Sequence, residues 1–380
     1  MIDREAIDAL RQRAEEATGP VLTAYVLTDP SLPANAAGAW ATRLRNALKE
    51  AGVPASLASR VLGRLQSSAV RARTLVVVAT DDWMEQLPLQ VDLPTADLRH
   101  GRSLVRYGAP YLTPLLQVLD EHARYGVLLM DAQRWRLFEV FAGEIEERAD
   151  AFGAIDTSEW RRLEESMRGV PQGVPARGGA GKDLFERRKT AWMRRFYRRV
   201  IPLLEQELAA RGIDRIVVLG PDAQVNHFVE LLPRRLRDRV VARAPGLPTR
   251  SASPGEVLER VAPLVERLEQ QEHARLIDRV LDHGTHGVEA TLQALQQGRL
   301  HAVVAPADVD QQVWRGREHG IVAATREQVE ALGDAPEPVD LLAVLPELAE
   351  SYAVRLDLVR GPDAERVRAE LGGMGGLLRW

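Results

Sequence analysis

The interpretation of this chain is decided by residues 168–208, which read RGVPQGVPARGGAGKDLFERRKTAWMRRFYRRVIPLLEQEL. The first part of this stretch is rich in Gly, Pro and small side chains and shows no apolar period, which predicts an exposed loop. A helix is predicted directly after the loop. Its apolar face is indicated by side chains that recur at spacings of three, four and seven: Phe185, Trp192, Phe196, Val200 and Leu203.

The predicted helix is strongly basic. Between Lys182 and Arg199 there are eight Lys or Arg residues against only Asp183 and Glu186. Basic helix faces are either solvated surface or contacts for a polyanion. The glycine-rich loop favours the second interpretation, because glycine lets a backbone enter a crowded site. We therefore expect an RNA-binding surface that includes Arg177, Lys182, Arg187, Arg188, Lys189, Arg194, Arg195, Arg198 and Arg199.

Composition sets limits on the class of protein. A chain of 380 residues predicts two or three domains, and its hydrophobic content of 45% is ample for packed cores. The sequence has no cysteine, which excludes disulfides, thiolate nucleophiles and cysteine-bound zinc. No run of eighteen apolar residues occurs, and the charged start MIDREAIDALRQRAEE lacks a signal core. We therefore expect a cytoplasmic protein that does not use a membrane.

The order of predicted elements indicates an α/β fold in three domains. An N-terminal α/β domain, 1–122, carries two predicted strands among helices, one within the strand-and-turn segment VLTAYVLTDPS, 21–31, and one at 74–80. A central domain, 123–250, opens with a hairpin from Tyr125 to Phe141 and contains the loop and the basic helix. The Pro/Ser/Gly-rich segment 245–256 is predicted to be a linker to a third domain, 251–380, in which helices and strands alternate.

This succession of parts resembles a known superfamily. The parts are VLTAYVLTDPS in the first domain, PYLTPLLQVLDEHARYGVLLMD at the entry to the second, the glycine-tipped basic helix, and the ending GGMGGLLRW. Together they resemble the class-1 release factors of archaea and eukaryotes and Pelota, and more narrowly the bacterial archaeo-eukaryotic release factor-like proteins. The resemblance implies an RNase-H-like central domain and a C-terminal α/β/α domain like Pelota-type RNA-binding ribosomal proteins.

The resemblance also implies a function for the loop. In release factors the tip Gly-Gly-Gln assists the attack of water on the peptidyl-tRNA ester. The matching residues here are Gly178, Gly179 and Ala180, so the tip keeps its glycines and the Ala180 amide but lacks the glutamine side chain. Without that side chain, part of the preorganisation for hydrolysis is lost. Gln172 is a nearby substitute candidate, although a loop glutamine is more often only solvated.

The first domain lacks the Asn-Ile-Lys-Ser and cysteine-containing decoding motifs of stop-codon readers. A chain without these motifs and without the tip glutamine looks more like Pelota-type proteins or the bacterial hibernation factor Balon. The leading hypothesis is therefore a translation factor of hibernation or rescue type in the ribosomal A site. Its expected partners are the ribosome, rRNA and the tRNA acceptor end, with a translational GTPase as a further candidate, and neither DNA nor a cofactor is expected. Two alternatives stay open: a peptidyl-tRNA hydrolase, and a stress-linked interaction scaffold that does not bind RNA.

Other candidate chemistry is weaker. Asp131, Glu139 and Asp222 lie where acids of a nuclease would lie, but a solvated turn is the favoured interpretation for Asp131. His283 and His286 are spaced for a metal on a helix, yet the adjoining glycines favour a helix break. The GGMGG segment is expected to form a tight turn, and no metal site is predicted. Among Trp192, Phe196 and Tyr197, the first two lie on the apolar face and are expected to pack in the core, which leaves Tyr197 as the better candidate to stack on bases.

Overall fold

The computed structural model describes residues 2–67, 72–93, 95, 98, 101–131, 134–148 and 180–379. These residues form two compact units, the first made of 1–122 with 269–380 and the second of 123–268. The division of the chain into domains 1–122, 123–250 and 251–380 stays a prediction. Among the described residues, no helix is long and apolar enough to cross a membrane.

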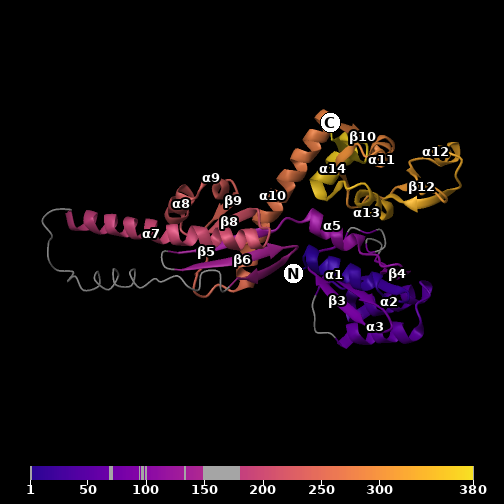
Figure 1. Ribbon diagram of the computed structural model, residues 1–380, viewed down its shortest axis with the longest axis horizontal. Coiled ribbons are helices and arrows are strands. Elements are labelled where there is room, and N and C mark those ends of the chain that lie inside the picture. Colours follow the sequence, from indigo (N-terminus) through magenta and orange to yellow (C-terminus); the bar gives the residue numbers. More distant parts are fainter. Residues whose placement is uncertain are drawn as a thin grey trace. The chain divides into compact units, whose positions relative to one another are not determined.

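The second unit is built on a five-stranded sheet (Figure 1). Its strand order is β7-β6-β5-β8-β9, in which β6 is antiparallel to β5 and β7 while β8 and β9 run parallel to β5. Numbered along the chain this order is 3-2-1-4-5 with only the second strand reversed, which is the arrangement of RNase-H-like sheets. The strands are β5 (Tyr125–Met130), β6 (Trp135–Phe141), β7 (Glu144–Glu147), β8 (Arg215–Leu219) and β9 (Val240–Ala244).

Helices cover both faces of this sheet. Successive residues of a strand point to opposite faces, so one strand contributes side chains to the core on each side. Leu128 and Met130 of β5 pack with α7 (Ala180–Ala210), α8 (Asp222–Leu231) and α9 (Arg234–Arg237). Val127 and Leu129 of the same strand pack with the first half of α10 (Pro254–His283). The predicted hairpin from Tyr125 to Phe141 is confirmed by β5 and β6.

Segment 245–253 differs from the linker predicted for it. Thr249 and Ala252 are buried, and their carbonyl oxygens accept hydrogen bonds from Nη1 of Arg136, at 3.2 and 2.6 Å. A Cβ built on Gly246 would lie 2.8 Å from the Cα of Gly220. The segment is therefore packed against the ends of the central strands, and its Pro and Gly content serves close approach rather than flexibility.

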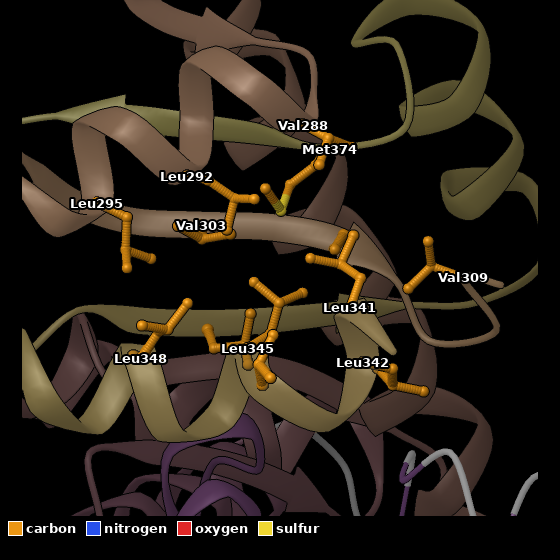
Figure 2. Packing of buried hydrophobic residues seen from close by; sticks show 14 of the residues in the cluster. Val288, Leu292, Leu295, Val303, Val309, Leu341, Leu342, Leu345, Leu348 and Met374 are labelled. Carbon is orange, nitrogen blue, oxygen red and sulfur yellow. The ribbon is translucent and has the colours of Figure 1, made fainter. Parts of the chain in front are cut away.

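The C-terminal part of the first unit is an α/β/α sandwich. Its four-stranded sheet has the order β10-β16-β11-β15, with β11 and β15 parallel. Val303 of β11 packs with α11 and α13, as Figure 2 shows, whereas its neighbours Ala302 and Val304 pack with α10 and α14. The elements are α11 (Val288–Gln296), α13 (Leu341–Ser351), α14 (Gly361–Glu370), β10 (Gly284–His286), β11 (Leu300–Pro306), β15 (Arg355–Val359) and β16 (Gly375–Leu378). The α/β class and this layering agree with the expectation from sequence.

The GGMGG segment is a turn followed by a strand rather than a turn alone. Gly372 and Gly373 have left-handed φ angles of 63° and 94°, and Gly375 begins β16. A Cβ on Gly376 would lie 2.6 Å from a methyl group of Leu300, so the strand passes close to this side chain. Leu377 is buried and Leu378 packs against the core.

The remaining elements of this unit form two further sheets. The N-terminal part is an antiparallel sheet of order β3-β2-β1-β4, with α2 and α3 packed on one face. Its elements are α1 (Arg4–Glu15), β1 (Val21–Leu27), the 3-10 helix η1 (Pro33–Gly38), α2 (Ala39–Glu50), α3 (Ala55–Ser67), β2 (Thr74–Ala79), β3 (Met84–Leu89), β4 (Leu104–Gly108) and α5 (Thr113–Glu121). A small sheet lies between β11 and α13 in the sequence, with β12 (Gln312–Gly316), β13 (Val322–Ala323), α12 (Arg326–Ala331) and β14 (Pro336–Asp340).

Candidate nucleic-acid interface

Helix α7 has one continuous buried face. Side chains at helical spacings pack into the core between the sheet and α8: Met193, Phe196, Tyr197, Val200, Ile201, Leu204 and Leu208. Figure 1 shows the amino-terminal part of α7 continuing past the end of the five-stranded sheet. The helix also continues through Pro202, which lies on its exposed side. The helix is therefore anchored to its unit through residues 193–208.

The opposite face of the anchored part carries arginines. Arg194, Arg195, Arg198 and Arg199 are all exposed. Their spacing of one, four and five places them in two adjacent rows along the helix, because residues four apart lie one above the other. We call these four residues the arginine face. Among the described residues, Arg194, Arg198 and Arg199 have no ion-pair or hydrogen-bond partner for their guanidinium groups.

Acidic side chains further along α7 are already engaged elsewhere. Glu205 pairs with Arg235 of α9 at 2.6 Å, and Glu207 pairs with Arg211 at 3.3 Å. These pairs satisfy the carboxylates without using the arginine face. Within the part of the chain that the structure describes, the guanidinium groups of Arg194, Arg198 and Arg199 are thus available to an external anion, and exposed guanidinium groups are suited to bidentate phosphate contacts.

The structure describes the other predicted site residues only in part. Gln172, Arg177, Gly178 and Gly179 lie outside the described residues. Ala180 is the first residue of α7, so the helix begins directly after the two glycines. The remaining basic residues of the prediction belong to α7, where only their helical backbone is described: Lys182, Arg187, Arg188 and Lys189.

Tyr197 does not have the base-stacking role predicted for it. Its side chain is 2% exposed, and burial raises the pKa of its hydroxyl above the usual value. The ring packs against Trp135 and Phe228, with centroid distances of 5.4 and 5.5 Å. The prediction was wrong because the apolar face of α7 is centred about one residue from the position inferred from the sequence. Leu203 of the predicted face is accordingly only partly buried.

The three acids considered for a nuclease site, Asp131, Glu139 and Asp222, have different surroundings. Glu139 is buried between Arg124 and Arg148, and both guanidinium groups donate to its carboxylate. Asp131 accepts the backbone N–H of Arg134 at 2.7 Å, as a turn aspartate does. Asp222 is the first residue of α8. Among the described residues, no group of three or more His, Asp or Glu side chains is arranged to hold a metal ion.

The histidine pair lies at a helix end, as the glycines indicated. Helix α10 ends at His283, and His286 belongs to β10. The Nε2 atom of His286 lies 3.0 Å from the carbonyl oxygen of Val280, in the last turn of the helix. This contact satisfies one of the carbonyl groups that a helix end leaves without an intrahelical partner.

Comparison with known proteins identifies the segment that contains this interface. Residues 110–266 match the model of bacterial archaeo-eukaryotic release factor family 10, which confirms the family resemblance for this part of the chain. A comparison with curated proteins gave no significant match.

Several solved structures are similar in part. An archaeal translation termination factor, aRF1, is 14% identical over 100% of this chain and 99% of its own, with a TM-score of 0.23. Dom34 of S. cerevisiae, described as a termination-like factor in RNA quality control that interacts with Hbs1, is 9% identical over 81% of this chain and 86% of its own, with a TM-score of 0.39. A model of ribosome-bound archaeal Pelota with ABCE1 gives 12% identity, 100% and 95% coverage and a TM-score of 0.40.

Proposed function

Because residues 110–266 match a release factor-like family, we propose that this chain is a translation factor of hibernation or rescue type that binds the ribosomal A site. The proposal includes rRNA and the tRNA acceptor end as contacts, in the cytoplasm. The observation that carries it is the arginine face of α7, which is exposed and has no neutralising acid among the described residues for Arg194, Arg198 and Arg199.

The shape of α7 suits this role. A helix of 31 residues is about 46 Å long at about 1.5 Å per residue, and the buried face that the structure describes runs from Met193 to Leu208. The glycines at 178 and 179 directly precede the outer end of this helix. The positive end of the helix dipole lies at the same end and favours phosphate. A rigid cationic rod with a glycine tip is therefore presented to the RNA, with phosphates held along its flank.

The tip sequence Gly178-Gly179-Ala180 supports occupation of the site rather than ester cleavage. Without a glutamine side chain, water is positioned at most by a backbone amide. The proposal therefore expects no efficient peptide release by the unaltered chain. Release of peptide at a rate that depends on Gly178 and Gly179 would instead establish a peptidyl-tRNA hydrolase.

Cosedimentation with ribosomes tests the proposal. The purified chain is mixed with vacant ribosomes and with ribosomes that carry P-site tRNA, and pelleted at increasing salt concentration. We expect saturable binding that weakens as salt increases, and competition by a ligand of the A site. Failure to pellet at low salt would contradict the proposal. Probing the same pellets from cell extract for translational GTPases tests the GTPase partner.

A further inference from the structure

The arginine face of α7 consists of two parallel rows. Arg194 and Arg198 lie about one turn apart and form the first row, and Arg195 and Arg199 form the second. Successive residues of a helix point about 100° apart, so the second row lies more than a quarter of the way around the helix from the first. On a helix about 10–12 Å across, side chains in these two directions end about 8 Å or more from each other. A ligand that contacts both rows therefore presents two separate lines of negative charge.

Each row continues toward the amino-terminal end of α7. Arg187 and Arg188 precede Arg194 and Arg195 by seven residues, which is about two turns of the same helix. Each row thus contains three arginines over about 16 Å of helix, at about 1.5 Å per residue.

The strip between the two rows carries short, uncharged side chains. Ala191 and Pro202 belong to α7, and their directions on the helix fall between those of Arg198 and Arg195. Both are exposed. The arginine side chains therefore extend past this strip on either side, and a ligand surface can approach the helix closely between them.

The charge of the rows is not cancelled by neighbouring acids. In the part of the chain that the structure describes, no acid neutralises Arg194, Arg198 or Arg199. The next acid along the first row, Glu205, is held by Arg235 of α9 at 2.6 Å. The two rows therefore complement a polyanion.

A double helix fits these features better than a single strand does. The minor groove of double-helical RNA is wide and shallow, and the phosphates of its two strands line its two rims. Its spacing is fixed, like that of α7, so neither partner has to be ordered on binding. Single strands are commonly bound by stacking their bases on aromatic rings. The aromatic side chains of α7 that the structure describes, Phe196 and Tyr197, are both buried.

We propose that α7 lies along the minor groove of double-helical RNA. The row of Arg194 and Arg198 contacts phosphates of one strand, Arg199 contacts those of the other strand, and Ala191 and Pro202 face the floor of the groove. This inference deepens the proposed ribosome binding and rests on it for the source of the duplex. Because the contacts are to phosphates, binding depends on the double-helical form and not on base sequence.

Binding of defined nucleic acids to the full chain tests the proposal. The probes are a fluorescently labelled RNA duplex, each of its strands alone, a DNA duplex of the same sequence and a second RNA duplex of different sequence. We expect the two RNA duplexes to bind equally and more tightly than the other probes. Equal binding of a single strand or of the DNA duplex, or no saturable binding of an RNA duplex at low salt, would overturn the proposal.

Two variants and a control locate the binding. Ala191→Gln places a longer, uncharged side chain between the rows and should weaken duplex binding about tenfold, while net charge and helix content stay the same. Arg194→Gln combined with Arg198→Gln should reduce the salt slope of duplex binding by about 2. Arg45→Gln combined with Arg64→Gln, at exposed positions of α2 and α3, should change neither quantity. Unchanged duplex binding in Ala191→Gln and in the Arg194 and Arg198 variant would refute the assignment.

The inference and the proposed function can fail separately. Cosedimentation with ribosomes by a chain that does not prefer duplex RNA would overturn the inference alone. A preference for duplex RNA in a chain that does not pellet with ribosomes would contradict the proposed function alone.

Discussion

Replacing Arg194, Arg198 and Arg199 together by glutamine should weaken ribosome binding and make it less sensitive to salt. Each phosphate contact contributes about 0.7 to 0.9 to the slope of log affinity against log salt, depending on whether the RNA is single-stranded or a duplex. Three lost contacts therefore reduce the slope by about 2 to 3. Between about 50 and 200 mM salt, a fourfold change, the unaltered chain should lose about 20 to 40 times more affinity than the variant.

The structure limits other effects of this change. The three side chains are exposed and glutamine has a helix propensity close to that of arginine, so α7 should remain folded. Arg195 is left unchanged because it already interacts within the protein. The assay is binding of fluorescently labelled chain to ribosomes over a salt series, with circular dichroism to confirm helix content.

A matched control removes the same charge elsewhere. Arg45, Arg64 and Arg279 are exposed helical arginines on α2, α3 and α10, and their replacement by glutamine alters net charge by the same amount. The control variant should keep the slope of the unaltered chain. If both triple variants show the same slope, the effect is one of net charge, and the assignment of phosphate contacts to the arginine face is refuted.

Three further predictions concern stability. The backbone amides of Glu318 and then His319 hold the pKa of Asp334 at about 2, below the usual value near 4. The ionised carboxylate therefore contributes its full stabilisation at pH values above about 4, and this contribution is lost as the pH falls through 2. Asp334→Asn should therefore lower the Tm at neutral pH, by an amount that shrinks toward pH 2; an equal loss at every pH would contradict this explanation. Ala142 has φ of 47° in the two-residue turn between β6 and β7, and Ala142→Asn should increase the free energy of unfolding by about 1 kcal/mol in urea melts, because asparagine tolerates this conformation; a decrease would argue against strain there. Gly284→Ala should destabilise the chain by several kcal/mol or prevent folding, since its Cβ would lie 2.5 Å from the carbonyl oxygen of Gly376 and 2.6 Å from that of Val280; a melting curve like that of the unaltered chain would show that the backbone yields.

Local patterns in the sequence predicted the elements that position the candidate interface. The hairpin from Tyr125 to Phe141 was predicted from the sequence and is confirmed by β5 and β6. The basic helix was predicted from apolar side chains at helical spacings. These features depend on neighbours in the sequence, so a single chain contains the information.

Features that depend on distant contacts were not predictable in the same way. Segment 245–253 has the composition of a linker, and only the donors of Arg136, more than a hundred residues earlier, explain why it is packed. Gly375 and Gly376 were predicted to lie in a turn because glycine disfavours strands, yet they belong to a strand that passes close to Leu300 and to Val280 of α10. Tyr197 was predicted to be exposed, but its side chain is buried. Adjacent residues of a helix point about 100° apart, so a small error in the predicted direction of the apolar face changes which of them is buried.

The packing of Met193 to Leu208 against the core fixes the direction of α7. About 20 Å of helix precedes Met193, so a tilt of about 10° at the anchored end would move the outer end by about 3.5 Å. Small changes in the packing of Phe228 or Trp135 against this helix would thus be magnified toward its amino-terminal end. The position of the helix end that follows Gly178 and Gly179 in the sequence is thereby set by side chains in the core.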